Sequence, residues 1–230
     1  MSTFVSFLFS QSILLPLIIG LIRIRKIQSS YYPFLALIML GALSEICSFL
    51  SIRYFKSNAI VSNTWCLVEC ILILYQFYRW RFHTRPRAWY WVVPALCVLA
   101  WLTENIVFMQ ITRFGHVFRI SYAFLLVMLS INEINYLITH ENRQLFKNAR
   151  FLICMGFIIF FLYQILFECS LYIVETEGNA TISNKIIRLQ MYVNVLTNTI
   201  FAVAMLFIPA RMQDFDTTME KFRKQYHQRQ

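Results

Sequence analysis

The sequence has little charge and few residues that break regular structure. Charged residues make up 14% of the 230 residues, against about 25% in an average soluble domain. There are five glycines and five prolines, and no Gly/Ser linker or low-complexity segment divides the chain. These absences argue against an ordinary soluble domain and against a chain of several linked domains.

The motifs of several enzyme classes are also missing. No HExxH sequence or intramembrane histidine pair suggests a zinc hydrolase, and no GxSxG sequence suggests a serine nucleophile. Neither a P-loop nor GxGxxG is present. The four histidines fall in predicted connectors or the tail: His83, His116, His140 and His227. We therefore expect no catalytic residues, no metal site and no cofactor, and the sequence argues against an enzyme.

The last apolar segment lacks the deep lysine that a retinal protein needs. Lys185 stands at the edge of this segment, and Asn194 and Asn198 stand at its depth. No internal repeat is visible, although such repeats are typical of many transporters. The sequence thus gives no support to a retinal protein or to a transporter built from repeats.

Long apolar runs, by contrast, dominate the chain. Hydrophobic residues make up 59% of it, and the mean hydropathy is +0.58. A run of about 20 apolar residues can span a bilayer as a helix. The sequence predicts seven spans, at 4–22, 33–52, 60–79, 89–109, 118–138, 151–173 and 186–209. We expect an all-α, polytopic seven-helix membrane domain over 1–210 and a short cytoplasmic tail over 211–230.

Lysine and arginine predict how this bundle is oriented. Fifteen of the 21 basic residues lie in the first, third and fifth connectors and the tail: Arg23, Arg25, Lys26, Arg79, Arg81, Arg85, Arg87, Arg143, Lys147, Arg150, Arg211, Lys221, Arg223, Lys224 and Arg229. Because basic connectors stay in the cytoplasm, we expect the N-terminus outside and the C-terminus inside. The first span has no basic residue before it, which argues against a cleaved signal peptide.

The net charge of +10 is therefore mostly a matter of topology. We expect contact with anionic lipid head groups and a location in the cytoplasmic (inner) membrane. The basic residues are spread over separate short connectors, so no nucleic-acid partner is expected. All six cysteines lie inside predicted spans, where free cysteine behaves as a small hydrophobic residue.

Glutamates recur inside the predicted spans. Each of spans two to six carries one: Glu45, Glu69, Glu104, Glu133 and Glu168. A charge at the bilayer centre costs roughly 2.5–3.5 kcal/mol on insertion scales. We therefore expect these side chains to face the interior of the bundle, with Glu69 near the midplane.

Other polar residues share faces with these glutamates at helical spacings of three, four or seven. They complete our set of ligand- or proton-binding candidates: Gln76, Arg119, Arg188, Asn194 and Asn198. Most of this polar surface lies in the outer half of the spans. The pattern indicates either a cavity that faces the outside or a buried hydrogen-bond network.

Three hypotheses remain open. The first is a sensor or binding protein whose outer cavity takes a small ligand or cation and signals to a membrane or cytoplasmic protein partner. The second is a proton- or cation-coupled transporter that uses Glu69 and Glu133. The third is a structural subunit of a membrane complex, in which the glutamates join helices through bonds that average about 0.6 kcal/mol.

Four segments carry a resemblance to known proteins: GLIRIRK (20–26), LSEICSF (43–49), NTWCLVECILILYQFY (63–78) and VNVLTNTIFAVAMLF (193–207). With them the chain resembles small, uncharacterised bacterial seven-helix integral membrane proteins over most of its length. The resemblance implies a fold and a membrane location. It assigns no functional residues.

Overall fold

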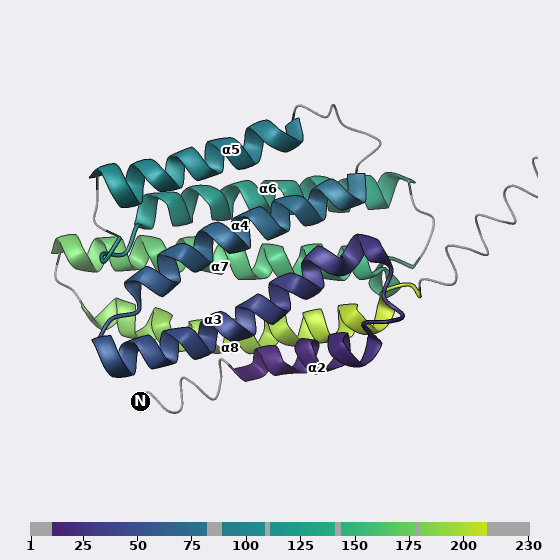
Figure 1. Ribbon diagram of the computed structural model, residues 1–230, viewed down its shortest axis with the longest axis horizontal. Coiled ribbons are helices and arrows are strands. Elements are labelled where there is room, and N and C mark those ends of the chain that lie inside the picture. The colour runs from purple at the N-terminus through teal and green to yellow at the C-terminus, as the bar shows by residue number, and fades with distance from the viewer. Residues whose placement is uncertain (1–10, 82–88, 109–110, 141–143, 178–179, 211–230) are drawn as a thin grey trace, which may run out of the picture.

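The protein is helical throughout the part that its computed structural model describes, residues 11–81, 89–108, 111–140, 144–177 and 180–210 (Figure 1). Within these ranges the one β-bridge joins Ile27 to Ala210. The elements are η1 (Gln11–Ile13), α2 (Leu14–Arg23), η2 (Ser29–Tyr31), α3 (Tyr32–Phe55), α4 (Ala59–Arg81), α5 (Trp89–Leu102), the π-helical η3 (Thr103–Phe108), α6 (His116–His140), η4 (Leu145–Lys147), α7 (Ala149–Glu177) and α8 (Ala180–Phe207).

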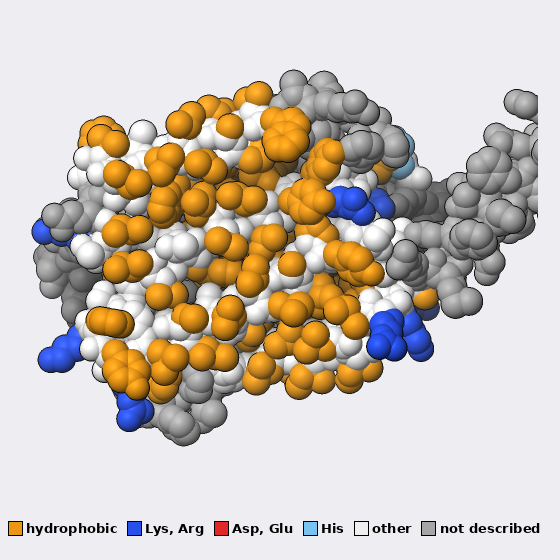
Figure 2. Space-filling view, in the orientation of Figure 1, with side chains coloured by type: hydrophobic (Ala, Val, Ile, Leu, Met, Phe, Trp, Pro, Cys, Tyr) orange, Lys and Arg blue, Asp and Glu red, His pale blue; other side chains and the backbone are white. Residues whose placement is uncertain are grey.

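Six of these helical segments are long and apolar enough to cross a membrane: Ser29–Phe55, Ala59–Trp80, Trp91–Phe108, His116–His140, Ala149–Tyr172 and Leu189–Phe207. Figure 2 shows hydrophobic side chains over most of one face of the bundle, with lysine and arginine at its two ends. This distribution fits a surface that lies in lipid. The prediction of a multi-pass helical membrane fold is therefore confirmed, with six helices of spanning length.

The first helix is shorter than the sequence predicted. α2 has ten residues, which corresponds to about 15 Å of helix, and only the short turn η1 precedes it in the described chain. The predicted first span, 4–22, lies partly outside the described residues. A count of seven spans thus stays a prediction.

The segment between the last two predicted spans, 174–185, is mostly helical. α7 continues to Glu177 and α8 already begins at Ala180. The physical reason is that apolarity marks only the part of a helix that lies in lipid. Backbone hydrogen bonds continue a helix into water as long as the sequence allows it.

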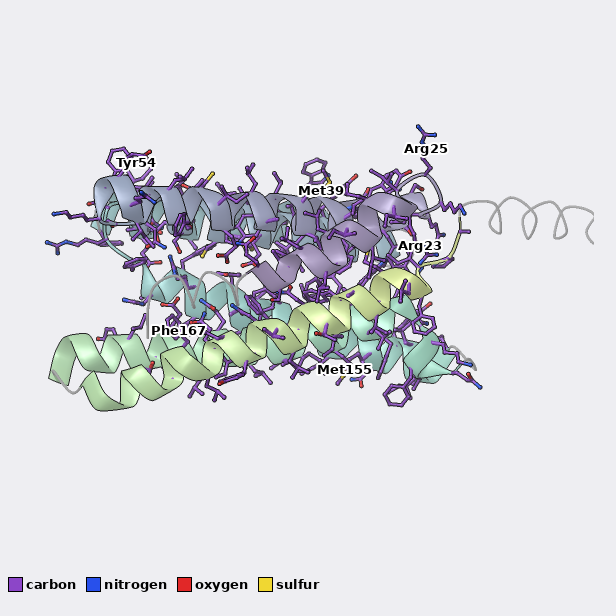
Figure 3. All side chains as sticks on the ribbon, turned by 90° about the horizontal axis from the view of Figure 1, so that it is seen from below. Arg23, Arg25, Met39, Tyr54, Met155 and Phe167 are labelled. Carbon is purple, nitrogen blue, oxygen red and sulfur yellow. The ribbon has the colours of Figure 1, made fainter. Side chains whose placement is uncertain are left out.

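The helices form two layers. α3 packs against α4 in one layer, and α6, α7 and α8 pack in sequence in the other, with α2 against both α8 and α3 (Figure 1). α5 packs mainly against α4. In Figure 3, Met39 points away from the bundle on the α3 side and Met155 on the α7 side, whereas Phe167 faces the space between the layers.

The two ends of the bundle differ, and we name each by one residue. The Ala210 end carries the segment between α2 and α3 and the end of α8, where Arg23 donates hydrogen bonds to the carbonyl oxygens of Met205, Leu206 and Ile208. A cation suits this place because the last carbonyls of a helix lack partners and carry partial negative charge. The Lys56 end carries the turn between α3 and α4.

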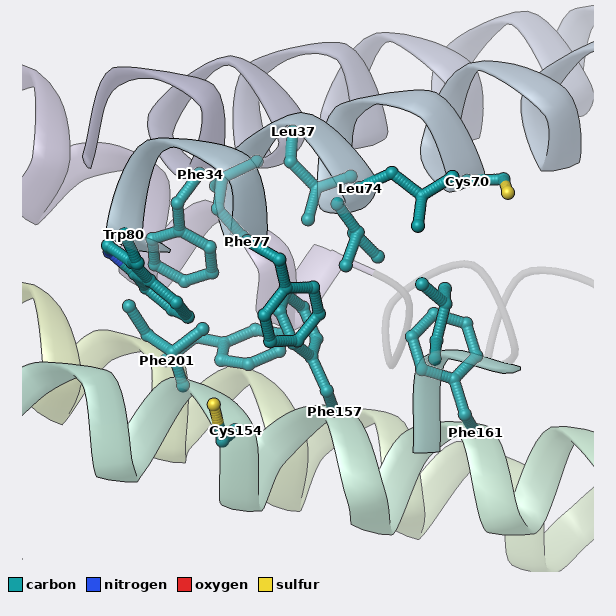
Figure 4. Close-up of a cluster of buried hydrophobic side chains, with 14 of the residues drawn as sticks. Phe34, Leu37, Cys70, Leu74, Phe77, Trp80, Cys154, Phe157, Phe161 and Phe201 are labelled. Carbon is teal, nitrogen blue, oxygen red and sulfur yellow. The ribbon is translucent and has the colours of Figure 1, made fainter. Parts of the chain in front are cut away.

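Aromatic side chains fill the space between the layers toward the Ala210 end (Figure 4). The ring of Phe34 lies edge-on to Phe201, with ring centroids 5.2 Å apart. Phe157 contacts both Phe34 and Phe201, and Phe161 continues the cluster toward the Lys56 end. The layers are thus packed tightly over one half of their length, which leaves the other half for the polar residues.

Candidate functional site: a half-open cavity between the layers

A cavity of about 420 Å³ lies between the two layers in the half nearer the Lys56 end. Its walls come from η1, α3, α4, α6, α7 and α8 and from Phe114. The polar side chains on them are Ser44, Glu45, Ser48, Asn58, Ser62, Glu69, Arg119, Tyr122, Gln164, Gln190, Asn194, Thr197 and Asn198. Five of the ten candidate residues therefore line one space: Glu45, Glu69, Arg119, Asn194 and Asn198.

Arg119 of α6 is held from three sides on one wall. Its guanidinium donates to Glu168 Oε1 at 3.1 Å, to Ser62 Oγ at 2.8 Å and to Asn63 Oδ1 at 3.0 Å. Its side chain is 7% exposed and that of Glu168 is 0% exposed. An unpaired charge is very costly in such surroundings. The ion pair joins α6 to α7, and the hydrogen bonds to Ser62 and Asn63 join α6 to α4.

Glu168 supports the arginine from behind the cavity wall. Besides Arg119 it accepts from Gln164 Nε2 at 2.9 Å, and His116 Nδ1 lies 2.6 Å from its Oε2. Both carboxylate oxygens are therefore engaged. Glu168 acts on the cavity through Arg119 instead of facing it, which differs from the sequence-based expectation of a ligand group.

Two members of this network, His116 and Asn63, were not predicted from the sequence. His116 was expected in a connector, but it is the first residue of α6 and is buried. Asn63 donates to the carbonyl oxygens of Ile111 and Arg113, at 3.1 and 2.7 Å, and so holds the segment before α6. His116 and Arg119 are three residues apart, a spacing that places them on one face of a helix. The predicted span began only at 118, so His116 was not counted as part of that helix.

Glu69 is the carboxylate nearest the middle of α4. It accepts a hydrogen bond from Tyr122 Oη at 2.9 Å, and Tyr122 is its one hydrogen-bond partner in the described part of the chain. Glu69 is the tenth residue after Ala59 and so lies about 15 Å along α4 from the Lys56 end. Its position near the bilayer midplane stays a prediction.

Two other candidates hold the fold together. Glu104 of η3 accepts from the backbone N–H groups of Val117 and Phe118, at 2.9 and 2.6 Å, and so caps the first turn of α6. Gln76 accepts from the N–H of Phe34 and donates to the carbonyl of Ser30, which ties the start of α3 to α4. Neither residue lines the cavity.

The remaining candidates lie elsewhere. Glu133 of α6 is buried nearer the Ala210 end and does not line the cavity. Arg188 belongs to α8, but its side chain lies outside the described residues. Asn198 lines the cavity and donates to Ser12 Oγ at 2.7 Å, so it connects α8 to η1.

Several buried polar atoms on the walls lack a hydrogen-bond partner within the described residues. They are Arg119 Nε, Asn194 Oδ1 and Thr197 Oγ1. A buried polar atom without a partner costs about 1–3 kcal/mol, and native proteins satisfy most such atoms with protein, water or ligand. These atoms therefore indicate that water or a ligand fills the cavity.

Metal-ligating side chains are not clustered in the part of the chain that the structure describes. Among the described residues, no three histidine, cysteine, aspartate or glutamate side chains are grouped as metal ligands. All six cysteines are free. The cavity offers hydrogen-bond acceptors, one guanidinium and aromatic rings, which is the chemistry of reversible binding of an organic or hydrated ligand.

The chain matches no family model, and the comparisons with curated proteins and with solved structures found no match.

Proposed function

We propose that the protein is a membrane sensor or binding protein whose cavity takes a small polar or cationic ligand. One observation carries this proposal. Arg119, Asn194 and Thr197 present buried polar atoms without a described partner around a half-open cavity that also bears Glu69. Polar groups inside a membrane bundle are costly and typically mark a site of function.

We further propose seven spans, with 4–22 as the first, and an Ala210 end that lies in the cytoplasm. The bias of lysine and arginine toward that end supports this orientation. The cavity would then face away from the cytoplasm. The resemblance to small bacterial seven-helix proteins supports a location in a bacterial cytoplasmic membrane, with anionic lipids around the basic connectors.

A route for a signal follows from the contacts of Arg119. Its partners belong to α4 and α7, while Arg119 itself belongs to α6. A ligand that bonds to Arg119 Nε would act on all three helices. We propose that their movement reaches a protein partner through the basic connectors and the tail 211–230.

A thermal-shift screen in lipid nanodiscs tests the cavity. We expect polar or cationic compounds to raise the Tm of the wild type and to have less effect on Glu45→Gln and Glu69→Gln. A ligand at about 100 times its Kd stabilises by about 2.7 kcal/mol, which is readily measured. Glu133→Gln is the matched control, because it removes a buried carboxylate that lies away from the cavity. Hits that shift all four proteins equally would contradict the proposed site.

Transport of protons or cations is a second candidate, supported by the depths of two glutamates. Glu69 lines the cavity about midway along α4, and Glu133 is buried nearer the Ala210 end. If these residues relay a proton, Glu69→Gln abolishes the proton flux of proteoliposomes, because glutamine cannot bind and release a proton. An unchanged flux in Glu69→Gln would exclude the relay. Glu104→Gln is the control, since Glu104 caps α6 outside the cavity.

The third candidate, a structural subunit, is supported by Gln76 and Glu104, because their hydrogen bonds serve only to join elements of the fold. Stoichiometric partners that co-purify with the protein, together with an empty ligand screen, would favour it over a binding protein.

A further inference from the structure

We infer that the ligand of this cavity is an amphiphilic organic cation, with an ammonium head at Glu69 and an apolar body on the phenylalanine floor. This inference rests on the proposed binding function. Its support comes from the charges and hydrogen-bonding groups of the walls and from the composition of the floor.

The charges on the wall favour a cation. Glu168 pairs with Arg119, so with a neutral His116 this pair carries no net charge. Glu69 accepts a hydrogen bond from Tyr122, and among the described residues it forms no ion pair of its own, although the charge of Arg119 acts on it. An ammonium group would give this carboxylate a counter-ion in surroundings where an uncompensated charge is expensive.

The hydrogen-bonding groups on the cavity walls also favour a cation. Glu69 and Asn194 Oδ1 are acceptors that line the cavity, and Thr197 Oγ1 can accept as well. Of the buried atoms on the cavity walls without a described partner, Arg119 Nε can only donate, Asn194 Oδ1 can only accept and Thr197 Oγ1 can do either. N–H groups of a ligand can bond to the acceptors, and the carboxylate of Glu69 favours a cation over an anion beside it.

The floor of the cavity is apolar and aromatic. Phe157, Phe161 and Phe201 line it and belong to the cluster that closes the space toward the Ala210 end (Figure 4). Phe161 also contacts the ring of Tyr122, with centroids 5.8 Å apart, so the aromatic surface reaches the partner of Glu69. A ligand that binds Glu69 therefore has apolar surface within reach, and aromatic faces also attract cations.

Binding to nanodiscs of the full-length protein tests the ligand class. The probe is 4-phenylbutylamine, compared with 4-phenylbutanol, 4-phenylbutyrate and ethylamine, with empty nanodiscs as the partition control. We expect the amine to bind about tenfold or more tightly than each comparison compound. The alcohol and the carboxylate lack the positive charge, and ethylamine lacks the apolar body. Glu69→Gln should remove this preference, and Glu133→Gln should keep it.

The possible failures are distinguishable. Equal binding of ethylamine and 4-phenylbutylamine would overturn the apolar part, and equal binding of the alcohol would overturn the cationic part, while the binding function would stand. No preference for 4-phenylbutylamine, together with other hits in the screen, would overturn the whole inference. A screen without any hit would overturn the proposed function itself.

Discussion

Replacing Glu168 by alanine should lower the free energy of unfolding by about 3–5 kcal/mol, because it leaves Arg119 buried without its counter-ion. An ordinary hydrogen bond between membrane helices is worth only about 0.6 kcal/mol. The charge left behind, and not the lost hydrogen bonds, therefore dominates the expected loss. Denaturant titration of the protein in bicelles measures it.

Two controls separate this explanation from a general loss of packing. Glu45→Ala removes a half-buried carboxylate that lines the cavity, and it should lower the free energy of unfolding by less than Glu168→Ala does. The double variant Glu168→Met with Arg119→Leu removes both charges, and it should recover much of the stability, since apolar replacements of buried pairs are often neutral or stabilising. Equal losses in Glu168→Ala and Glu45→Ala would contradict the proposed role of the ion pair.

The second large effect is expected at Gly156, where α7 approaches α8. A Cβ atom at this position would lie 2.4 Å from Cε1 of Phe201. That ring is held by Phe34 and Phe157, at centroid distances of 5.2 and 5.5 Å, and cannot turn aside. Gly156→Ala should therefore cost about 1–3 kcal/mol of stability, as overpacked cores do, in the same denaturant titration.

Gly20→Ala provides the control for Gly156. The added Cβ atom would meet Leu35 Cδ1 at 2.6 Å, which is the end of a flexible side chain, and alanine is the better helix former by about 1 kcal/mol. We expect a smaller change there. Phe201→Leu should partly rescue Gly156→Ala, because the two residues are in contact. If Phe201→Leu does not restore stability to Gly156→Ala, the contact between these two residues is not the cause of the loss.

Helical spacing explains why five of the candidate residues lie on the walls of one cavity, because it determines which residues share a face. Glu69 on α4, and Asn194 and Asn198 on α8, repeat at intervals that bring polar groups to one side. We expected these polar side chains in the interior of the bundle because a polar side chain that faces lipid is costly. These arguments need only one helix at a time, and therefore one sequence suffices for them.

Contacts between helices were harder to predict. The spacing of polar residues within one helix shows which face they share, but it does not show which residues of a neighbouring helix lie opposite them. Glu104 shares a face with other polar residues of its span, yet the chain turns back after η3 and brings the first turn of α6 to its carboxylate. Gln76 likewise finds backbone groups at the start of α3. Both residues were assigned to a binding site, but the fold itself supplies their partners.

The order of helix contacts has a mechanical consequence. α2, α3, α4, α6, α7 and α8 follow one another in a ring of contacts, since α2 also packs on α8. The contact of α3 with α4 and those of α6, α7 and α8 are extensive, whereas α2 with α3 and α4 with α6 meet over short stretches. A ligand that widens the ring should therefore move the α3–α4 pair as one rigid body against the other helices. The two short contacts, one of them bridged by Arg119, would serve as its hinges.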